Sequence, residues 1–268
     1  MVLSAITEII PISLKMSGKL KTLLRRCLVG RTYQIGEKEL PSVTTILNIL
    51  DKPALMPWAA KTTAAAFKEA VINSIDCLSE ELLDNIEQEA KGAYRKKSTE
   101  AMDIGTRVHK IIESWIHSDG LLTPDEVIDP YAKRGLEAFL TWGEQHDIEI
   151  VSNEQVVTDD MLYAGRYDLL AKVDGKLTLI DFKTASGIWF SNWLQLGGYA
   201  IAIDEPVEEI AVLRIDKETG DLEYQSRTCW MVYAQAFVQL ARYYETHKRL
   251  EEIEKEIKRG NKDSKHKK

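Results

Sequence analysis

The stretch that decides the fold is Tyr163-Ala-Gly-Arg-Tyr-Asp-Leu-Leu-Ala-Lys-Val-Asp-Gly-Lys-Leu-Thr-Leu-Ile-Asp-Phe-Lys-Thr184. Two β-rich runs flank Asp174-Gly175, a dipeptide typical of a two-residue hairpin turn. With a two-residue turn at 174–175, the sequence numbers of each pair of facing residues add up to 349, so Asp168 faces Asp181. Lys183 lies two positions beyond Asp181 and therefore on the same face. Apolar neighbours on both faces predict a central hairpin that is covered on both sides.

This hairpin predicts a metal site. Two carboxylates that face each other in a buried hairpin repel one another, which is costly unless a cation lies between them. The oxygens of Asp168 and Asp181 are hard ligands of the kind that bind Mg²⁺ or Mn²⁺. Lys183 can orient or deprotonate a water and stabilise negative charge on a phosphoryl group. In the alternative interpretation, Asp168 merely ends a strand and Asp181 forms a surface ion pair with Lys183; the register and the apolar flanks favour the metal site.

Outward from the hairpin, the sequence divides into a helical first half and a mixed second half. Apolar residues at helical spacing, a proline at a helix start and a capping box at 123–126 indicate helices, and β-branched runs indicate strands. This order of elements predicts an α/β fold. The expected helices lie at 42–50, 58–75, 103–116, after 123, at 193–203 and at 230–258, and the expected strands at 148–157, 163–173, 176–183 and 209–216.

Composition and charge bound the class of protein. The chain has 268 residues, 44% hydrophobic and 29% charged, which is enough for one domain with its own core. The net charge is −7, but residues 1–31 carry +5 and residues 247–268 carry +4, which leaves −16 on the remainder. So acidic a body argues against broad, sequence-blind binding of phosphate backbones. Any contact with nucleic acid must be local, bridged by a metal or helped by the ends.

Absent motifs exclude several cofactors. The three cysteines lie far apart, so one chain cannot build a four-cysteine iron–sulfur cluster. The P-loop pattern G-x-x-x-x-G-K-[ST] is absent, so no nucleotide cofactor is expected.

No stretch approaches the roughly 18 apolar residues of a membrane span, so no membrane partner is expected. The cysteine usage favours a reducing compartment such as the cytoplasm, whereas residues 1–31, taken as a presequence, would direct the chain to mitochondria.

Four motifs, taken together, narrow the class further. In chain order they are Gly105-Thr-Arg-Val-His109 on a predicted helix, Gly165-x-x-Asp168, Ile180-Asp-Phe-Lys-Thr184 and Gln195-x-x-x-Tyr199. Their order and spacing resemble the RecB-like exonuclease branch of the PD-(D/E)XK nuclease superfamily, in particular phage-type and mitochondrial genome maintenance exonucleases. The resemblance spans residues 41–199. It implies a restriction-endonuclease-like core, in which helices flank a central mixed β-sheet, with a helical N-terminal half.

The resemblance also implies roles for single residues. Asp168 and Asp181 would bind the catalytic divalent ion, and Lys183 would act on the attacking water. The backbone carbonyl of Phe182 and the side chain of His109 would complete the metal ligands, although a lone histidine on an amphipathic helix is more often a packed or solvated residue. The remaining candidates are Glu154 as an acid near the metal, a position that a strand-end surface carboxylate explains equally well, and Gln195, Tyr199, Ser42, Thr44, Thr184 and Arg166 as DNA contacts.

Four of these residues, in two pairs, have a physical argument beside the resemblance. Gln195 and Tyr199 are four residues apart, so they share a helix face and can reach a phosphate beside the metal. Ser42 and Thr44 lie at a predicted helix start, where hydroxyls can hold a backbone phosphate. An ordinary N-cap explains Ser42 equally well.

The resemblance therefore predicts a DNA exonuclease that depends on Mg²⁺ or Mn²⁺. It would hydrolyse phosphodiester bonds, from single-stranded ends, in DNA replication, repair or recombination, with replication or recombination proteins as partners. Two alternatives stay open: a structure-specific or restriction-like endonuclease, and a catalytically silent module that binds DNA ends. The expected parts are a flexible basic leader (1–31), a helical part with the histidine motif (32–146), the nuclease core with the C-terminal helix (147–259) and a disordered basic tail (260–268).

Overall fold

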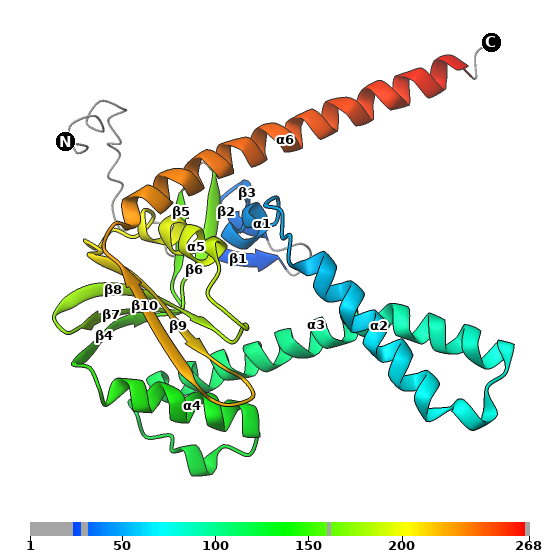
Figure 1. Cartoon of the computed structure of the whole chain (residues 1–268). Helices are drawn as coiled ribbons and strands as arrows, with labels where there is room; N and C mark the ends of the chain where they lie inside the picture. Colours follow the sequence, from blue (N-terminus) through cyan, green and yellow to red (C-terminus); the bar gives the residue numbers. More distant parts are fainter. Residues whose placement is uncertain (1–23, 28–31, 160–161, 266–268) are drawn as a thin grey trace, which may run out of the picture.

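A mixed five-stranded sheet forms the centre of the protein (Figure 1). The computed structural model describes residues 24–27, 32–159 and 162–265. In the sheet, only β8 and β9 are parallel among the paired strands. The predicted α/β class, with a mixed sheet between helices and a helical N-terminal half, is confirmed. The strand order is β10 (Leu222–Arg227), β9 (Glu209–Ile215), β8 (Lys176–Lys183), β7 (Leu169–Val173) and β4 (Ile148–Asn153).

The central hairpin β7–β8 has the predicted register. Its ladder runs from Leu169 opposite Ile180 to Val173 opposite Lys176. The two turn residues have φ angles of 51° and 82°, both positive as in a type I′ turn. The ladder ends at Leu169, so Asp168 lies one residue outside the paired strand.

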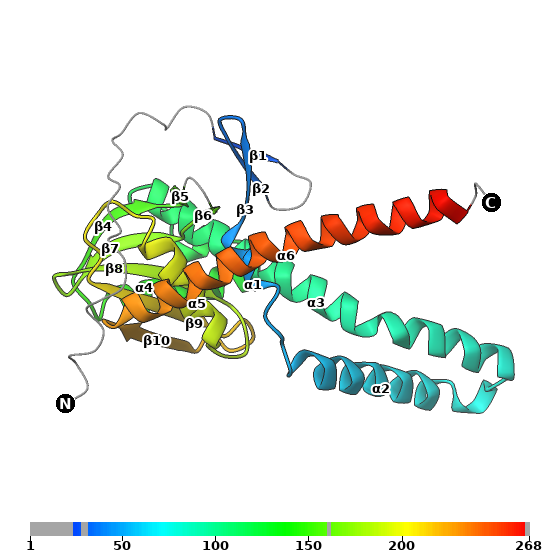
Figure 2. The ribbon, with the colours of Figure 1, turned by 90° about the horizontal axis from the view of Figure 1, so that it is seen from above.

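Helices cover both faces of the sheet, so the molecule has three layers (Figures 1 and 2). Leu170 and Leu179 belong to the core on one face, whereas Leu169 and Ile180 belong to the core on the other. The hairpin is therefore covered on both sides, as its apolar flanks predict. The first face packs against α1 (Val43–Leu47), α5 (Phe190–Ala200) and α6 (Trp230–Lys265), and the second against α3 (Glu80–His117) and α4 (Pro130–Gly143).

The chain also forms a helical arm and two small sheets beside the central sheet. The helix α2 (Leu55–Asn73), followed by the 3₁₀ turn η1 (Ile75–Cys77), runs beside α3 in an arm that extends away from the sheet (Figure 2). Two small sheets, β1–β3 and β5–β6, were not separately predicted. Their strands are β1 (Leu24–Cys27), β2 (Thr32–Ile35), β3 (Lys38–Pro41), β5 (Val156–Asp159) and β6 (Tyr163–Arg166).

The predicted helix after the capping box at 123–126 was wrong in extent. The box forms a single 3₁₀ turn, η2 (Pro124–Glu126), and α4 begins only at Pro130. The carboxylate of Asp129 accepts a hydrogen bond from the Tyr131 N–H and caps α4. A capping box satisfies the first N–H groups of a turn, but it does not determine how far the helix continues.

Both predicted chain ends need correction where the structure describes them. Within the predicted leader, Leu24–Cys27 pairs with β2 as a strand, and the rest of the leader lies outside the described residues. The helix α6 continues to Lys265, so residues 260–265 are helical and not a disordered tail; residues 266–268 lie outside the description. A single glycine at 260 costs a helix only about 1 kcal/mol, which explains why it does not end α6. Among the described helices, none is long and apolar enough to cross a membrane.

Candidate active site

The two predicted carboxylates lie together at one end of the central strands, where β7 begins and β8 ends. Asp181 is 2% exposed, and the side chain of Asp168 is 14% exposed. The carboxylate of Asp168 accepts a hydrogen bond from the Phe182 N–H, with 2.8 Å between Oδ2 and N. The sharp turn and the strand register thus bring Asp168, just before β7, beside the buried Asp181 of β8.

Asp181 is held by two other side chains. Lys183 Nζ lies 2.5 Å from Asp181 Oδ2, and Gln195 Nε2 of α5 donates a hydrogen bond to Oδ1 at 3.1 Å. Oδ2 forms this ion pair but no hydrogen bond of regular geometry. Burial raises the pKa of Asp181 to about 6, and the charge of Asp168 raises it as well, while Lys183 opposes them. The two acids are therefore electrostatically coupled.

His109 approaches these acids from α3. Its Nδ1 lies 3.6 Å from Asp168 Oδ2, and its ring meets the ring of Phe182 edge-on, with centroids 5.8 Å apart. Burial by itself would lower the pKa of His109, but the charge of Asp168, a hydrogen bond to Asp168 and the charge of Asp181 together raise the pKa above its usual value. Asp168 shows the converse: burial would raise its pKa, but His109 and Lys183 hold it below its usual range. The predicted histidine is thus beside the predicted carboxylates.

Glu154 also reaches the site, and its backbone is unusual. It has a φ of 52°, a left-handed conformation uncommon for residues other than glycine. Its N–H donates to the Asp168 carbonyl at 3.0 Å, and its carboxylate lies 2.6 Å from Arg166 Nε. Burial raises the pKa of Glu154, and so does the charge of Asp168. The turn that interrupts the predicted strand 148–157 therefore carries Glu154 to Asp168.

Gln195 and Tyr199 share the face of α5 that looks onto Asp181, as their spacing predicts. Gln195 Nε2 donates to Tyr199 Oη at 3.2 Å as well as to Asp181. Burial raises the pKa of Tyr199 well above its usual value, and the charges of Asp181 and Asp168 add to this. Tyr199 packs on Gly165, where a Cβ atom would lie 2.4 Å from Tyr199 Cε1. In this structure Gln195, which is also bonded to Tyr199, holds the Asp181 carboxylate.

The remaining predicted site residues differ in burial and in hydrogen-bond partners. Ser42 is buried, and its Oγ accepts a hydrogen bond from the Thr45 N–H at 3.0 Å, which is the N-cap of the alternative interpretation. Thr44 Oγ1 lies 3.0 Å from Ser42 Oγ. Thr184 follows β8 directly and is half-buried, and the side chain of Arg166 is 43% exposed beside Glu154. For Phe182, whose backbone carbonyl was predicted as a metal ligand, the group that contacts Asp168 is the backbone N–H.

Two further residues, which sequence reasoning did not assign to the site, influence its charges. Glu113 of α3 lies close enough for its charge to raise the pKa of Glu154. Its position one helical turn after His109 was the available signal. Tyr33 of β2 lies close enough to raise the pKa of Tyr199. No local pattern connects Tyr33 to a site more than a hundred residues away.

The donor set fits a divalent ion. Within residues 24–27, 32–159 and 162–265, no three His, Cys, Asp or Glu side chains are prearranged as a metal-ligand group. The acids are held instead by Lys183, by Gln195 and by the Phe182 N–H. Carboxylate oxygens are nevertheless the donor type that suits Mg²⁺ or Mn²⁺, and Asp181 Oδ2 has no hydrogen bond of regular geometry.

Comparisons with known proteins do not identify a family. No protein-family model matches the sequence, and no curated protein matches it. The solved crystal structure of SSO0001 is 16% identical, and the match covers 67% of this chain and 83% of that chain, with a TM-score of 0.29. A structural likeness at this TM-score supports no conclusion on fold or function.

Proposed function

We propose that this chain is a divalent-metal-dependent DNA exonuclease of the RecB-like PD-(D/E)XK type, acting from single-stranded ends in replication, repair or recombination. One observation carries the proposal. The buried Asp181 on β8 and the largely buried Asp168 just before β7 lie together at one end of the sheet, with Lys183 2.5 Å from Asp181 and His109 3.6 Å from Asp168. This arrangement costs stability and is typical of a reaction centre.

The ion would be held by Asp168 and Asp181, with His109 beside them. When bound, it would supply Lewis-acid stabilisation of charge on a phosphodiester. Lys183 Nζ would hold the attacking water and balance negative charge on the phosphoryl oxygens. Gln195, which bonds to both Asp181 and Tyr199, would keep the Asp181 carboxylate in one orientation. Arg166, half exposed beside Glu154, is available to contact a backbone phosphate.

The choice of exonuclease over endonuclease rests on the resemblance of the four motifs. We test it with a time course on linear single-stranded DNA labelled at either end and on circular single-stranded DNA, with Mg²⁺, Mn²⁺ or EDTA. We expect metal-dependent loss of the linear strands only, and the label released first gives the polarity. Cleavage of the circles would support the endonuclease, and intact DNA with every ion would leave the end-binding module and contradict the nuclease.

Metal binding can be measured without any DNA. Mn²⁺ at one hundred times its Kd should stabilise the wild-type protein by about 2.7 kcal/mol, because an ion that binds only the folded state shifts the unfolding equilibrium. Thermal unfolding of the Asp181→Asn variant should show little of this shift. Glu149→Gln, which changes an exposed acid on β4, is the matched control and should keep it. An equal shift in the wild type and in Asp181→Asn would place the ion elsewhere.

A further inference from the structure

Arg214 of β9 stands next to Lys183 in the sheet. The parallel β8–β9 ladder pairs these two residues, and the side chain of Arg214 is only 15% exposed. The chain leaves β8 at Lys183 and enters α5 at Phe190, so residues 184–189 form a loop. This loop connects the lysine of the site to the helix that carries Gln195.

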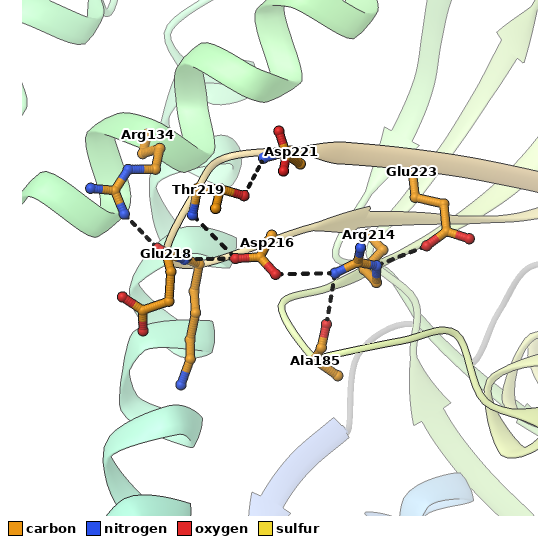
Figure 3. Close-up of polar contacts among 9 residues, drawn as sticks. Arg134, Ala185, Arg214, Asp216, Glu218, Thr219, Asp221 and Glu223 are labelled. Carbon is orange, nitrogen blue, oxygen red and sulfur yellow. Dashed lines mark hydrogen bonds and ion pairs between the residues drawn. The ribbon is translucent and has the colours of Figure 1, made fainter.

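The guanidinium of Arg214 joins the loop to the neighbouring hairpin β9–β10 (Figure 3). Its Nη1 donates to the carbonyl of Ala185 at 3.2 Å, two residues after Lys183. Its Nε donates to Glu223 Oε2 at 2.9 Å, and its Nη1 lies 3.5 Å from Asp216 Oδ2. The planar fork of one guanidinium thus contacts three groups with fixed directions.

Asp216, one of the two acids that contact Arg214, is itself fixed. Asp216 Oδ1 accepts hydrogen bonds from the Glu218 N–H at 2.9 Å and the Thr219 N–H at 3.1 Å, and these bonds lower the pKa of Asp216 (Figure 3). Asp216, which faces Arg214, is therefore fixed by the backbone of its own turn. Arg134 of α4 contacts the same hairpin separately, by donating to the carbonyl of Lys217 at 2.6 Å.

Packing leaves part of the loop unsupported. Ala185 and Ser186 are exposed, so burial does not fix their backbone. On the preceding residue, Thr184 Oγ1 packs against Gly105 of α3, where a Cβ atom would lie only 2.8 Å away. Gly105 is one helical turn before His109. The loop thus lies where the elements that carry Lys183, Gln195 and His109 meet.

We propose that Arg214 is a positioning residue: by holding the Ala185 carbonyl, it fixes the loop 184–189 and thereby the position of Lys183 over Asp181. The inference rests on the proposed function, because it assigns Arg214 to the same site. Lysine cannot replace it, since an ammonium group lacks the planar fork that serves Ala185 and Glu223 together.

The test compares Arg214→Lys with Arg134→Lys. Both changes remove an arginine that donates to a backbone carbonyl at this end of the molecule, but only Arg214 touches the loop. We expect Arg214→Lys to lower kcat on linear single-stranded DNA about tenfold with KM within twofold, because small misplacements of a reacting group slow the chemical step. Arg134→Lys should keep kcat within twofold. An equal loss of kcat in both variants, or no loss in Arg214→Lys, would overturn the inference.

Hydrogen–deuterium exchange separates this inference from the proposed function. The amides of residues 184–189 should exchange faster in Arg214→Lys than in the wild type, and at the wild-type rate in Arg134→Lys. Unchanged exchange in Arg214→Lys overturns the role of Arg214 whatever the activity. A wild-type protein without nuclease activity contradicts the proposed function, while the exchange rates still decide whether Arg214 holds the loop.

Discussion

Replacing Lys183 by alanine is expected to lower kcat for DNA hydrolysis by about 10³-fold, because proton transfer and charge stabilisation by one positioned group contribute rate factors of this order. Lys183 Nζ is 2.5 Å from Asp181 Oδ2, so its removal also takes the nearest cation from a buried acid. The measurement is a single-turnover time course on linear single-stranded DNA with Mg²⁺ or Mn²⁺. Circular dichroism on the same samples checks that the variant is folded.

The matched control is Lys172→Ala on the adjacent strand β7. Lys172 pairs with Glu149 on the surface, and both side chains are about half exposed or more. Exposed pairs of this kind contribute about 0–1 kcal/mol, so we expect unchanged stability and kcat within twofold. A folded Lys183→Ala variant that cleaves DNA at a rate near that of the wild type would remove Lys183 from the mechanism.

Replacing Gly165 by alanine is expected to destabilise the protein by about 1–3 kcal/mol, the usual cost of overpacking a filled core. The added methyl group would lie 2.4 Å from Tyr199 Cε1 and 3.1 Å from Val43 Cγ2. Tyr199 is buried and bonded to Gln195, which also holds Asp181. The displaced ring would therefore disturb Asp181 as well, and kcat should fall together with stability. Chemical denaturation and the cleavage assay measure the two effects.

Gly92→Ala provides the comparison for this substitution. Gly92 lies within α3, and a methyl group there would meet no atom within 4 Å. Alanine is the better helix former, so this variant should be up to about 1 kcal/mol more stable and equally active. If Gly165→Ala were as stable and as active as Gly92→Ala, the close packing of β6 on Tyr199 would contribute to neither stability nor activity.

Much of the central site follows from local rules. A two-residue turn leaves one register for the strands that flank it, and side chains alternate strictly between the two faces of a strand. The alignment of Asp168, Asp181 and Lys183 was therefore readable from 22 consecutive residues, and the ladder confirms the register. The shared face of Gln195 and Tyr199 follows in the same way from the helical period.

Other parts of the site depend on contacts between distant segments. Glu154 reaches Asp168 through a left-handed backbone residue that interrupts the predicted strand. Tyr33 comes from a small sheet in a region predicted as helical. Arg214 gains its role from an edge strand, β10, that the sequence pattern did not predict. Such positions are set by tertiary packing, which overrides weak local preferences.

The sequence by itself thus determined the α/β class, the central hairpin and the face on which its two acids and lysine lie, because turn geometry and side-chain period act over a few residues. Only the tertiary structure decided that His109, about sixty residues before Asp168, stands 3.6 Å from it. It also decided that Asp181 is 2% exposed and that Gln195 bonds to it. The approach of α3 and α5 to the end of the sheet depends on core packing between elements far apart in the chain, and no local period encodes it.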